Sequence, residues 1–281
     1  MAALKLGGDP AETQKAAPVG VDEKFFIKKH FSFLFIVVAF VALNAFAAVF
    51  VNFDVLQAIM DLPGGFVWFT VNFMPTPECL DSLEKILPAL LSTVLDSVAA
   101  SCTAAILAYI FAVIGSRTVG LGGPVPLIVR AIASVFRNIP IVAWAFLLLF
   151  SFKQGEFTGY LALFLQSFGF LTRCFLESID ELALGPVEAL KSSGATYLQI
   201  IVRCVIPMSI TQVISWVLYM VETNIRDATL VGMLTGTGIG FVFDLYYKGF
   251  RYDSSGLVLV CVIVVVIACE VTSNFIRRKV M

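Results

Sequence analysis

Six long apolar runs constrain this chain of 281 residues more than any other feature of its sequence. A helix that crosses a bilayer needs about 20 predominantly apolar residues, and the runs with their flanks are of that order. Hydrophobic residues make up 59% of the chain and charged residues 14%, whereas soluble domains average about 45–50% apolar and about 25% charged residues. We therefore predict an all-α integral membrane protein with about six transmembrane helices. The predicted spans are residues 31–53, 87–114, 127–152, 159–176, 207–221 and 257–271.

The distribution of basic residues predicts how these spans are oriented. Most of the 19 Lys and Arg residues fall on one side of the membrane if the N-terminus is placed inside, and short cytoplasmic loops retain positive charge. We therefore expect both termini to be cytoplasmic. The predicted organisation is a disordered cytoplasmic tail over 1–30, a first transmembrane helix over 31–53, an outer loop over 54–85 and a five-helix core over 86–276.

Two further features concern the outer side of the membrane and the first span. Residues 54–85 and 226–256 are long outer segments with apolar content, so we expect them to lie at or dip into the membrane surface, where an outer partner can dock. Residues 45–47 match a small-x-small cleavage pattern, but they lie within a run long enough to span. We therefore expect an uncleaved first helix.

A polar island over residues 180–206 separates the fourth and fifth runs and predicts two short helices with a kink. Pro186 suits the start of the first helix, because its missing N–H lies among the groups without a helical partner there. Glu188 follows where a carboxylate faces the positive end of the helix dipole. Gly194 is expected to end this helix, since glycine accepts the left-handed conformation of a C-terminal cap.

The second short helix is predicted from its own start signal. Thr196 and Gln199 have the spacing of a capping box, in which each side chain bonds a free backbone N–H of the first turn. Pro207 is expected to close the island and to open the fifth span.

The island also resembles the cytoplasmic loop of ABC importer permeases, with the signature E-A-A-x(3)-G-x(9)-I-x-L-P. Glu188-Ala189, Gly194 and Pro207 match it at the same spacing, while Leu190, Cys204 and Ile206 replace other small or apolar residues. The sequences at 137–140, 185–190 and 222–229 further resemble the phosphonate permease branch. The similarity covers about residue 83 to the C-terminus and implies a type I importer permease with a MetI-like core.

This resemblance implies an assembly and a set of functional residues. It implies that the chain forms half of a pathway for phosphonate or a related phosphorus oxyanion in the bacterial inner membrane. It implies an ABC ATPase dimer on the cytoplasmic side, an extracytoplasmic substrate-binding protein and a second permease chain, the same or related. ATP and Mg would belong to the ATPase, with no cofactor or metal on this chain. The residues implied in ATPase coupling are Pro186, Glu188, Ala189, Leu190, Gly194, Ala195, Thr196 and Pro207.

Other classes of function find little support in the residues. The sequence at 185–192 is close to a phosphate-binding loop, but Leu190 occupies the position of the second glycine, so we expect no ATP site here. The six Cys lack paired metal-ligand spacing, and four of them fall in apolar runs, where Cys behaves as a small hydrophobe. We find no catalytic set, and the net charge of −1 gives no reason to expect nucleic acid. The chain is not expected to be an enzyme.

Four polar residues within or beside apolar runs are candidates for the substrate pathway: Asp96, Glu222, Asn224 and Arg226. Ionisable groups at membrane depth are rare and often functional. Arg226 or Asn224 could meet the anion, or Glu222 and Arg226 could form a structural ion pair four residues apart. Asp96 could touch the pathway or hold a Ser or Thr across the bundle. Arg137 is interpreted as a structural residue at the cytoplasmic end of the third span.

Two alternative functions remain open. One is a permease of the same architecture for another small solute, such as an amino acid. The other is an ATPase-independent secondary transporter or channel, which inverted repeats or broken helices at the midplane would favour. An intramembrane hydrolase is disfavoured by the missing catalytic groups.

Overall fold

The computed structural model describes residues 23–280, and all regular elements within that range are helices. The chain divides into two compact units, the first ending at Phe66 and the second beginning at Val67. Five described helices are long and apolar enough to cross a membrane, or six if one sharply bent pair counts as a single span. The predicted all-α fold with about six spans is therefore confirmed.

The first unit is built around α1 (Glu23–Val51), which contains a candidate span from His30 to Val51. The predicted tail boundary at residue 30 is wrong, because the helix already begins at Glu23. Lys and Glu favour helix when they extend an apolar span, and residues 23–30 contain four of them. The rest of the predicted tail, residues 1–22, lies outside the described residues.

The segment predicted as an outer loop over 54–85 is largely helical. It contains α2 (Val55–Phe73) and a 3₁₀ helix (Pro77–Ser82). Asp54 caps α2, because its Oδ1 accepts hydrogen bonds from the backbone N–H groups of Leu56 and Gln57 at 3.0 and 3.1 Å. The apolar residues that suggested a membrane-surface loop thus form a capped helix.

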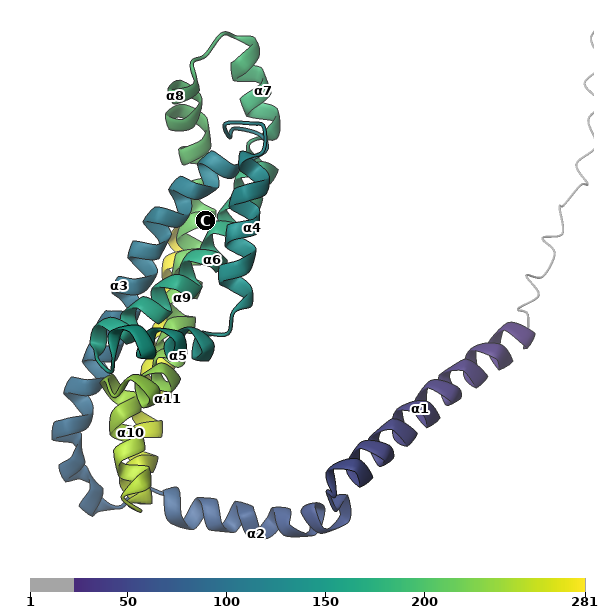
Figure 1. Cartoon of the computed structure of the whole chain (residues 1–281), viewed down its shortest axis with the longest axis vertical. Coiled ribbons are helices and arrows are strands. Elements are labelled where there is room, and N and C mark those ends of the chain that lie inside the picture. Colours follow the sequence, from purple (N-terminus) through teal and green to yellow (C-terminus); the bar gives the residue numbers. More distant parts are fainter. Residues whose placement is uncertain (1–22, 281) are drawn as a thin grey trace, which may run out of the picture. The chain divides into compact units, whose positions relative to one another are not determined.

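Three long helices form the centre of the second unit: α3 (Leu83–Gly115), α6 (Glu156–Leu182) and α9 (Ile206–Thr235). They run side by side in Figure 1 and contact one another extensively. Ala104, Ala108 and Ala112 of α3 are 0% exposed and belong to one core cluster with Leu171 and Phe175 of α6. Small residues one turn apart let two helix backbones approach closely, as is typical of membrane helix pairs.

The third predicted span, 127–152, is not one helix but a bent pair. α4 (Val125–Asn138) and α5 (Ile141–Phe152) meet at 90°. Pro140 causes the break, because proline offers no N–H to a helix and disfavours helical geometry in the preceding residue. Ile139 accordingly has φ −82° and ψ 119°, an extended conformation.

The fifth predicted span ends too early. α9 continues to Thr235, and α10 (Gly238–Lys248) follows where an outer loop was expected over 226–256. The helix continues past its charged residues because they pair along its own surface, as described below. Gly236 then ends α9 with φ +72°, a left-handed conformation that suits glycine.

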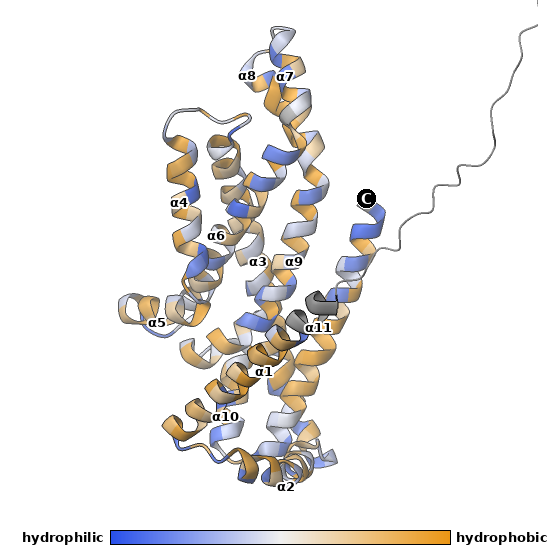
Figure 2. Ribbon diagram, turned by 90° about the vertical axis from the view of Figure 1, so that its right-hand side faces the viewer, coloured by the Kyte–Doolittle hydropathy of each residue, from blue (hydrophilic) through white to orange (hydrophobic). Residues whose placement is uncertain are grey.

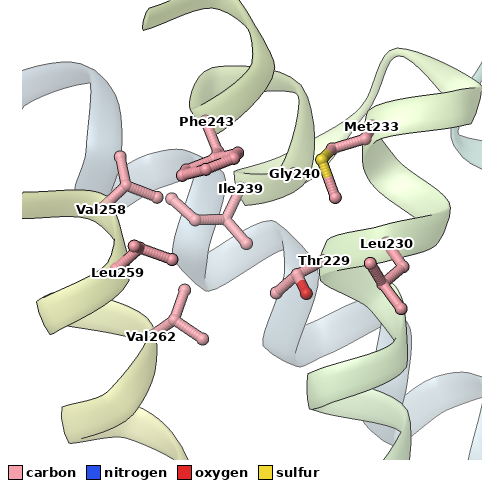
Figure 3. A pocket seen from close by; sticks show the side chains of 9 residues that line it. All are labelled: Thr229, Leu230, Met233, Ile239, Gly240, Phe243, Val258, Leu259 and Val262. Atoms are coloured by element: carbon pink, nitrogen blue, oxygen red, sulfur yellow. The ribbon is translucent and has the colours of Figure 1, made fainter. Parts of the chain in front are cut away.

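α11 (Tyr252–Val280) completes the second unit and packs against α9 and α10. The ribbon of α11 in Figure 2 is coloured as hydrophobic along most of its length and as hydrophilic at its C-terminal end, whose last turn contains Arg277, Arg278 and Lys279. A pocket of about 190 Å³ lies between α9, α10 and α11 (Figure 3). Its nine lining residues carry no charge, so it does not suit an anion.

Candidate coupling loop and substrate pathway

The polar island forms a helical hairpin that projects from one end of the second unit. It consists of α7 (Leu184–Ser192), α8 (Tyr197–Ile200) and a π-helical turn (Ile201–Val205) that leads into α9. Figure 1 shows α7 and α8 at the end of the bundle opposite α10. Val187 is 0% exposed and anchors α7 in the main core cluster, while Glu188 and Ala189 are exposed. The hairpin therefore has one buried side and one side available to a partner.

The predicted caps of the hairpin are confirmed. Gly194 has φ +82°, and the N–H of Ala195 donates to the Leu190 carbonyl at 3.0 Å, which closes the end of α7. Thr196 and Gln199 form the capping box, with the Thr196 N–H donating to Gln199 Oε1 at 2.9 Å. These local bonds fix the turn between the two short helices.

Pro186 differs from its predicted position, whereas Pro207 stands in the first turn of α9, at the start of the fifth span. α7 begins at Leu184, so Pro186 is its third residue, where the backbone N–H would still lack a helical partner. Pro207 does not separate the island from the fifth span, because helical structure runs without a break from Tyr197 to Thr235. The π-helical turn before Ile206 absorbs the missing N–H of Pro207.

An aspartate at the end of α6 joins three elements beside the hairpin. Asp180 Oδ1 accepts hydrogen bonds from Ser116 Oγ at 2.6 Å and from the Arg117 N–H at 2.9 Å. Its Oδ2 pairs with Arg130 Nη2 of α4 at 2.5 Å. Lys191 of α7 donates to the carbonyl of Thr118 in the same α3–α4 loop at 3.0 Å. This cluster ties α7 to the ends of α3, α4 and α6.

Sequence reasoning missed the Asp180 cluster. Its members are up to 64 residues apart, so no short motif contains them. The available signal was the presence of Asp180 and Arg130 near the facing ends of neighbouring apolar runs.

Asn224 lies inside the bundle, where it contacts two neighbouring helices. Its side chain is 0% exposed, and Nδ2 donates to Ser101 Oγ of α3 at 2.8 Å and to Ser167 Oγ of α6 at 2.7 Å. Polar side chains that bond across membrane helices hold those helices together. Asn224 therefore links the three central helices.

The other pathway candidates lie apart from Asn224. Glu222 and Arg226 form the predicted ion pair at 3.2 Å, with side chains 13% and 50% exposed. Asp96 lines a small cavity of about 20 Å³ with Thr93, Tyr160 and other residues of α6, α9 and the α9–α10 turn. The structure thus brings Glu222 and Arg226 together, and it places Asp96 and Asn224 in separate environments. Among the described residues, no group of three or more His, Cys, Asp and Glu could hold a metal ion.

The sequence suggested that Arg137 lies at the cytoplasmic end of the third span, but the structure places it elsewhere. It lies in the last turn of α4, just before the 90° bend. A Cβ on Gly169 would lie 2.6 Å from the Arg137 backbone nitrogen, and Gly169 is the middle residue of α6. Arg137 therefore lies halfway along the central helices, with its side chain exposed. The misplacement follows from treating the bent pair as one straight span.

The fold and the projecting hairpin define the class of protein: a membrane permease of the ABC importer type. The chain resembles a crystal structure of the MetNI methionine ABC transporter in an inward facing conformation, with a TM-score of 0.64 and 18% identity. The likeness covers 73% of this chain and 99% of that chain.

The chain belongs to the family of binding-protein-dependent transport system inner membrane components, whose family model matches residues 104–278. It is therefore a multi-pass inner-membrane transport subunit. The chain is 30% identical over 203 residues to the phosphate-import permease protein PhnE of Mycolicibacterium smegmatis, covering 72% of this chain but only 38% of that relative. It is 27% identical over 192 residues to the phosphite transport system permease protein PtxC of Stutzerimonas stutzeri, covering 67% of this chain and 69% of PtxC.

Proposed function

We propose that this chain is the permease subunit of an ATP-driven importer for phosphonate, phosphite or a related phosphorus oxyanion. The projecting α7–α8 hairpin, with its signature spacing and its exposed Glu188 and Ala189, is the observation that carries the proposal. The names of the two relatives, for phosphate and phosphite transport, support the substrate class.

In this proposal α7 is the coupling helix that docks on a cytoplasmic ABC ATPase. Glu188 and Ala189 provide the contact, while Leu190 and Ala195 pack inward against the core cluster. The caps at Gly194 and Thr196 hold the hairpin in shape. Pro186 and Pro207 set where the hairpin begins and where it passes into α9, completing the proposed coupling residues.

The assembly requires partners that supply energy and substrate. Two ATPase chains would bind ATP and Mg, and a second permease chain, the same or related, would form the other half of the pathway. An extracytoplasmic binding protein would deliver the anion at the α10 end of the bundle. ATP binding and hydrolysis would shift the pathway between outward and inward states, because the partners bind those two states with different affinity.

The four polar residues chosen from the sequence enter this proposal with different roles. Asn224 holds α3, α6 and α9 together at the pathway wall. Glu222 and Arg226 form a paired site on α9, and Asp96 discourages anions from entering beside α6 by like-charge repulsion.

The test is uptake of phosphite and methylphosphonate into proteoliposomes that contain the chain with the ATPase and binding protein encoded beside it. Glu188→Arg and Gly194→Asp should abolish ATP-dependent uptake while the chain still inserts, because both disturb the docking face of α7. Glu270→Arg is the matched charge reversal on α11, and it should retain uptake, since Glu270 is exposed and lies outside both the hairpin and the α10 end of the bundle.

Two outcomes would contradict the proposal. Uptake that persists without any ATPase would identify an ion-coupled carrier instead. The second outcome is ATP-dependent uptake that is inhibited by methionine or another amino acid but not by phosphite. It would support the importer mechanism and reject the substrate class.

A further inference from the structure

We infer that Arg137, together with Arg173, forms a phosphorus-oxyanion contact halfway along the permease bundle. This inference rests on the proposed function, because it assigns a substrate site to the pathway of that importer. Arg137 was not among the pathway residues chosen from the sequence, and nothing in the coupling mechanism uses it.

The first argument is position. The α4–α5 break brings the end of α4 to the middle of α6, where Gly169 gives the Arg137 backbone room to approach. The side chain of Arg137 is exposed at that level, and the carboxyl end of a helix favours a positive charge in its last turn. In secondary transporters discontinuous helices near the midplane form the substrate site, and the α4–α5 break gives Arg137 a comparable position in this permease.

The second argument is charge. Arg173 of α6 donates from Nε to Glu177 Oε1 at 2.5 Å, with side chains 31% and 56% exposed. Arg137 forms no ion pair with any residue from 23 to 280. Gly169 of α6 lies against the Arg137 backbone, and Arg173 is one helical turn further along the same face of α6, which places the two arginines in one neighbourhood. Arg173 is therefore paired with a carboxylate while Arg137 is not, and an anion would balance the charge of Arg137.

The third argument is that two other arginines of the second unit already have carboxylate partners. Arg226 pairs with Glu222, and Arg130 pairs with Asp180. A guanidinium with free N–H groups binds phosphorus oxyanions with two parallel hydrogen bonds, and Arg137 has these groups available.

A cavity near Cys174 indicates on which side of Arg173 the anion binds. A cavity of about 230 Å³ next to Cys174 is lined by both Glu177 and Glu181, along with Trp216 of α9. Two carboxylates repel an anion, so the cavity is not the binding site itself. The anion therefore binds on the Arg137 side of Arg173.

The test compares Arg137→Gln, Arg137→Lys and Arg278→Gln in the complete transporter, with phosphite as substrate and the binding protein saturating. Losing a charge-assisted contact should lower the uptake rate of Arg137→Gln about tenfold or more, while ATP hydrolysis without substrate stays within about twofold of the intact protein. Arg137→Lys keeps the charge but not the two-pronged geometry, so its uptake should be intermediate. Arg278→Gln, an exposed arginine in the last turn of α11, should match the intact protein.

The ratio of phosphite imported to ATP hydrolysed separates a substrate contact from a structural role. A structural role would lower uptake and hydrolysis together, and that result would overturn the inference. Unchanged uptake in Arg137→Gln would overturn it as well. If Arg137→Gln inserts poorly, Arg137→Lys decides: a lowered ratio supports the contact, and a normal ratio rejects it.

Two further experiments test whether Arg137 binds a lipid or the second permease chain in place of the substrate. Vesicles of phosphatidylcholine with and without phosphatidylglycerol test a lipid phosphate, and a defect seen only with the anionic lipid would assign Arg137 to the headgroup instead. Light scattering of the purified complex tests a carboxylate of the second permease chain, since loss of permease pairing in Arg137→Gln would assign it there. Uptake by the unsubstituted transporter tests the proposed function separately. If it imports no phosphorus oxyanion, the proposed function is wrong whatever the Arg137 variants do.

Discussion

Asn224 shows how neighbouring polar residues of one helix can have separate roles. It lies between Glu222 and Arg226 in the sequence, but it points to a different face of the helix. Its neighbours pair on the surface of α9 while Asn224 turns inward to Ser101 and Ser167. A polar residue in an apolar helix can therefore hold the bundle together without contacting a substrate.

We expect Asn224→Ala to lower the stability of the bundle, because it removes two hydrogen bonds between helices. Bonds of this kind in membrane proteins contribute about 0.6 kcal/mol on average and about 1.7 at most, so the pair should cost about 1–2 kcal/mol. Thermal unfolding in detergent measures the change. Asn44→Ala is the matched control, since Asn44 bonds only the Phe40 carbonyl of its own helix.

A different result would change the role of Asn224. If Asn224→Ala unfolds like the intact protein and yet loses uptake, then the amide acts on the substrate in another conformation and the structural interpretation fails.

At the scale of elements, the α7–α8 hairpin is specified almost entirely by local chemistry. The glycine cap, the capping box and the short helices follow from residues less than ten positions apart, and the sequence predicts all of them. The α4–α5 bend was also signalled locally by Pro140, but a proline can equally open a helix, and the apolar residues on both sides favoured one span. The Asp180 cluster depends on contacts between distant segments, which no local pattern contains.

We expect Gly194→Ala to destabilise the hairpin, because an alanine at φ +82° costs about 1–2 kcal/mol. Limited proteolysis of the purified protein should cut the turn faster, and ATP-dependent uptake should fall. Gly185→Ala is a matched control within α7, since a Cβ there meets open space, and alanine favours helix by up to about 1 kcal/mol over glycine. Equal proteolysis of the two variants would show that the left-handed cap does not hold the turn.

At the scale of the whole molecule, composition predicts the fold class well, but the extents of the helices less well. Hydropathy locates where spans cross, yet Glu222 and Arg226 neutralise each other, so α9 extends beyond its apolar part. Asp54 likewise starts a helix in a segment that lacked the length of a span. The membrane orientation follows from the distribution of Lys and Arg and stays a prediction.

Thiol labelling of intact cells tests that orientation. In a variant whose six native cysteines are replaced, Gln154→Cys should react with a membrane-impermeant maleimide from outside, and Ser193→Cys should react only after permeabilisation. Both positions are exposed in turns at opposite ends of the bundle. Labelling of Ser193→Cys in intact cells would place α7 outside and would exclude a cytoplasmic ATPase as its partner.

The unbroken helix from Tyr197 to Thr235 has a mechanical consequence. Its 39 residues form a rod about 58 Å long, nearly twice the thickness of the hydrocarbon layer. Tilting such a rod by about 5° about one end displaces the other end by about 5 Å. The π-helical turn at Ile201–Val205 lies close to the hairpin, and it is the point about which we expect the long helix to tilt. A small displacement of α7 would therefore produce a larger displacement at the α10 end of the molecule. No chain of side-chain rearrangements between the two ends would be needed.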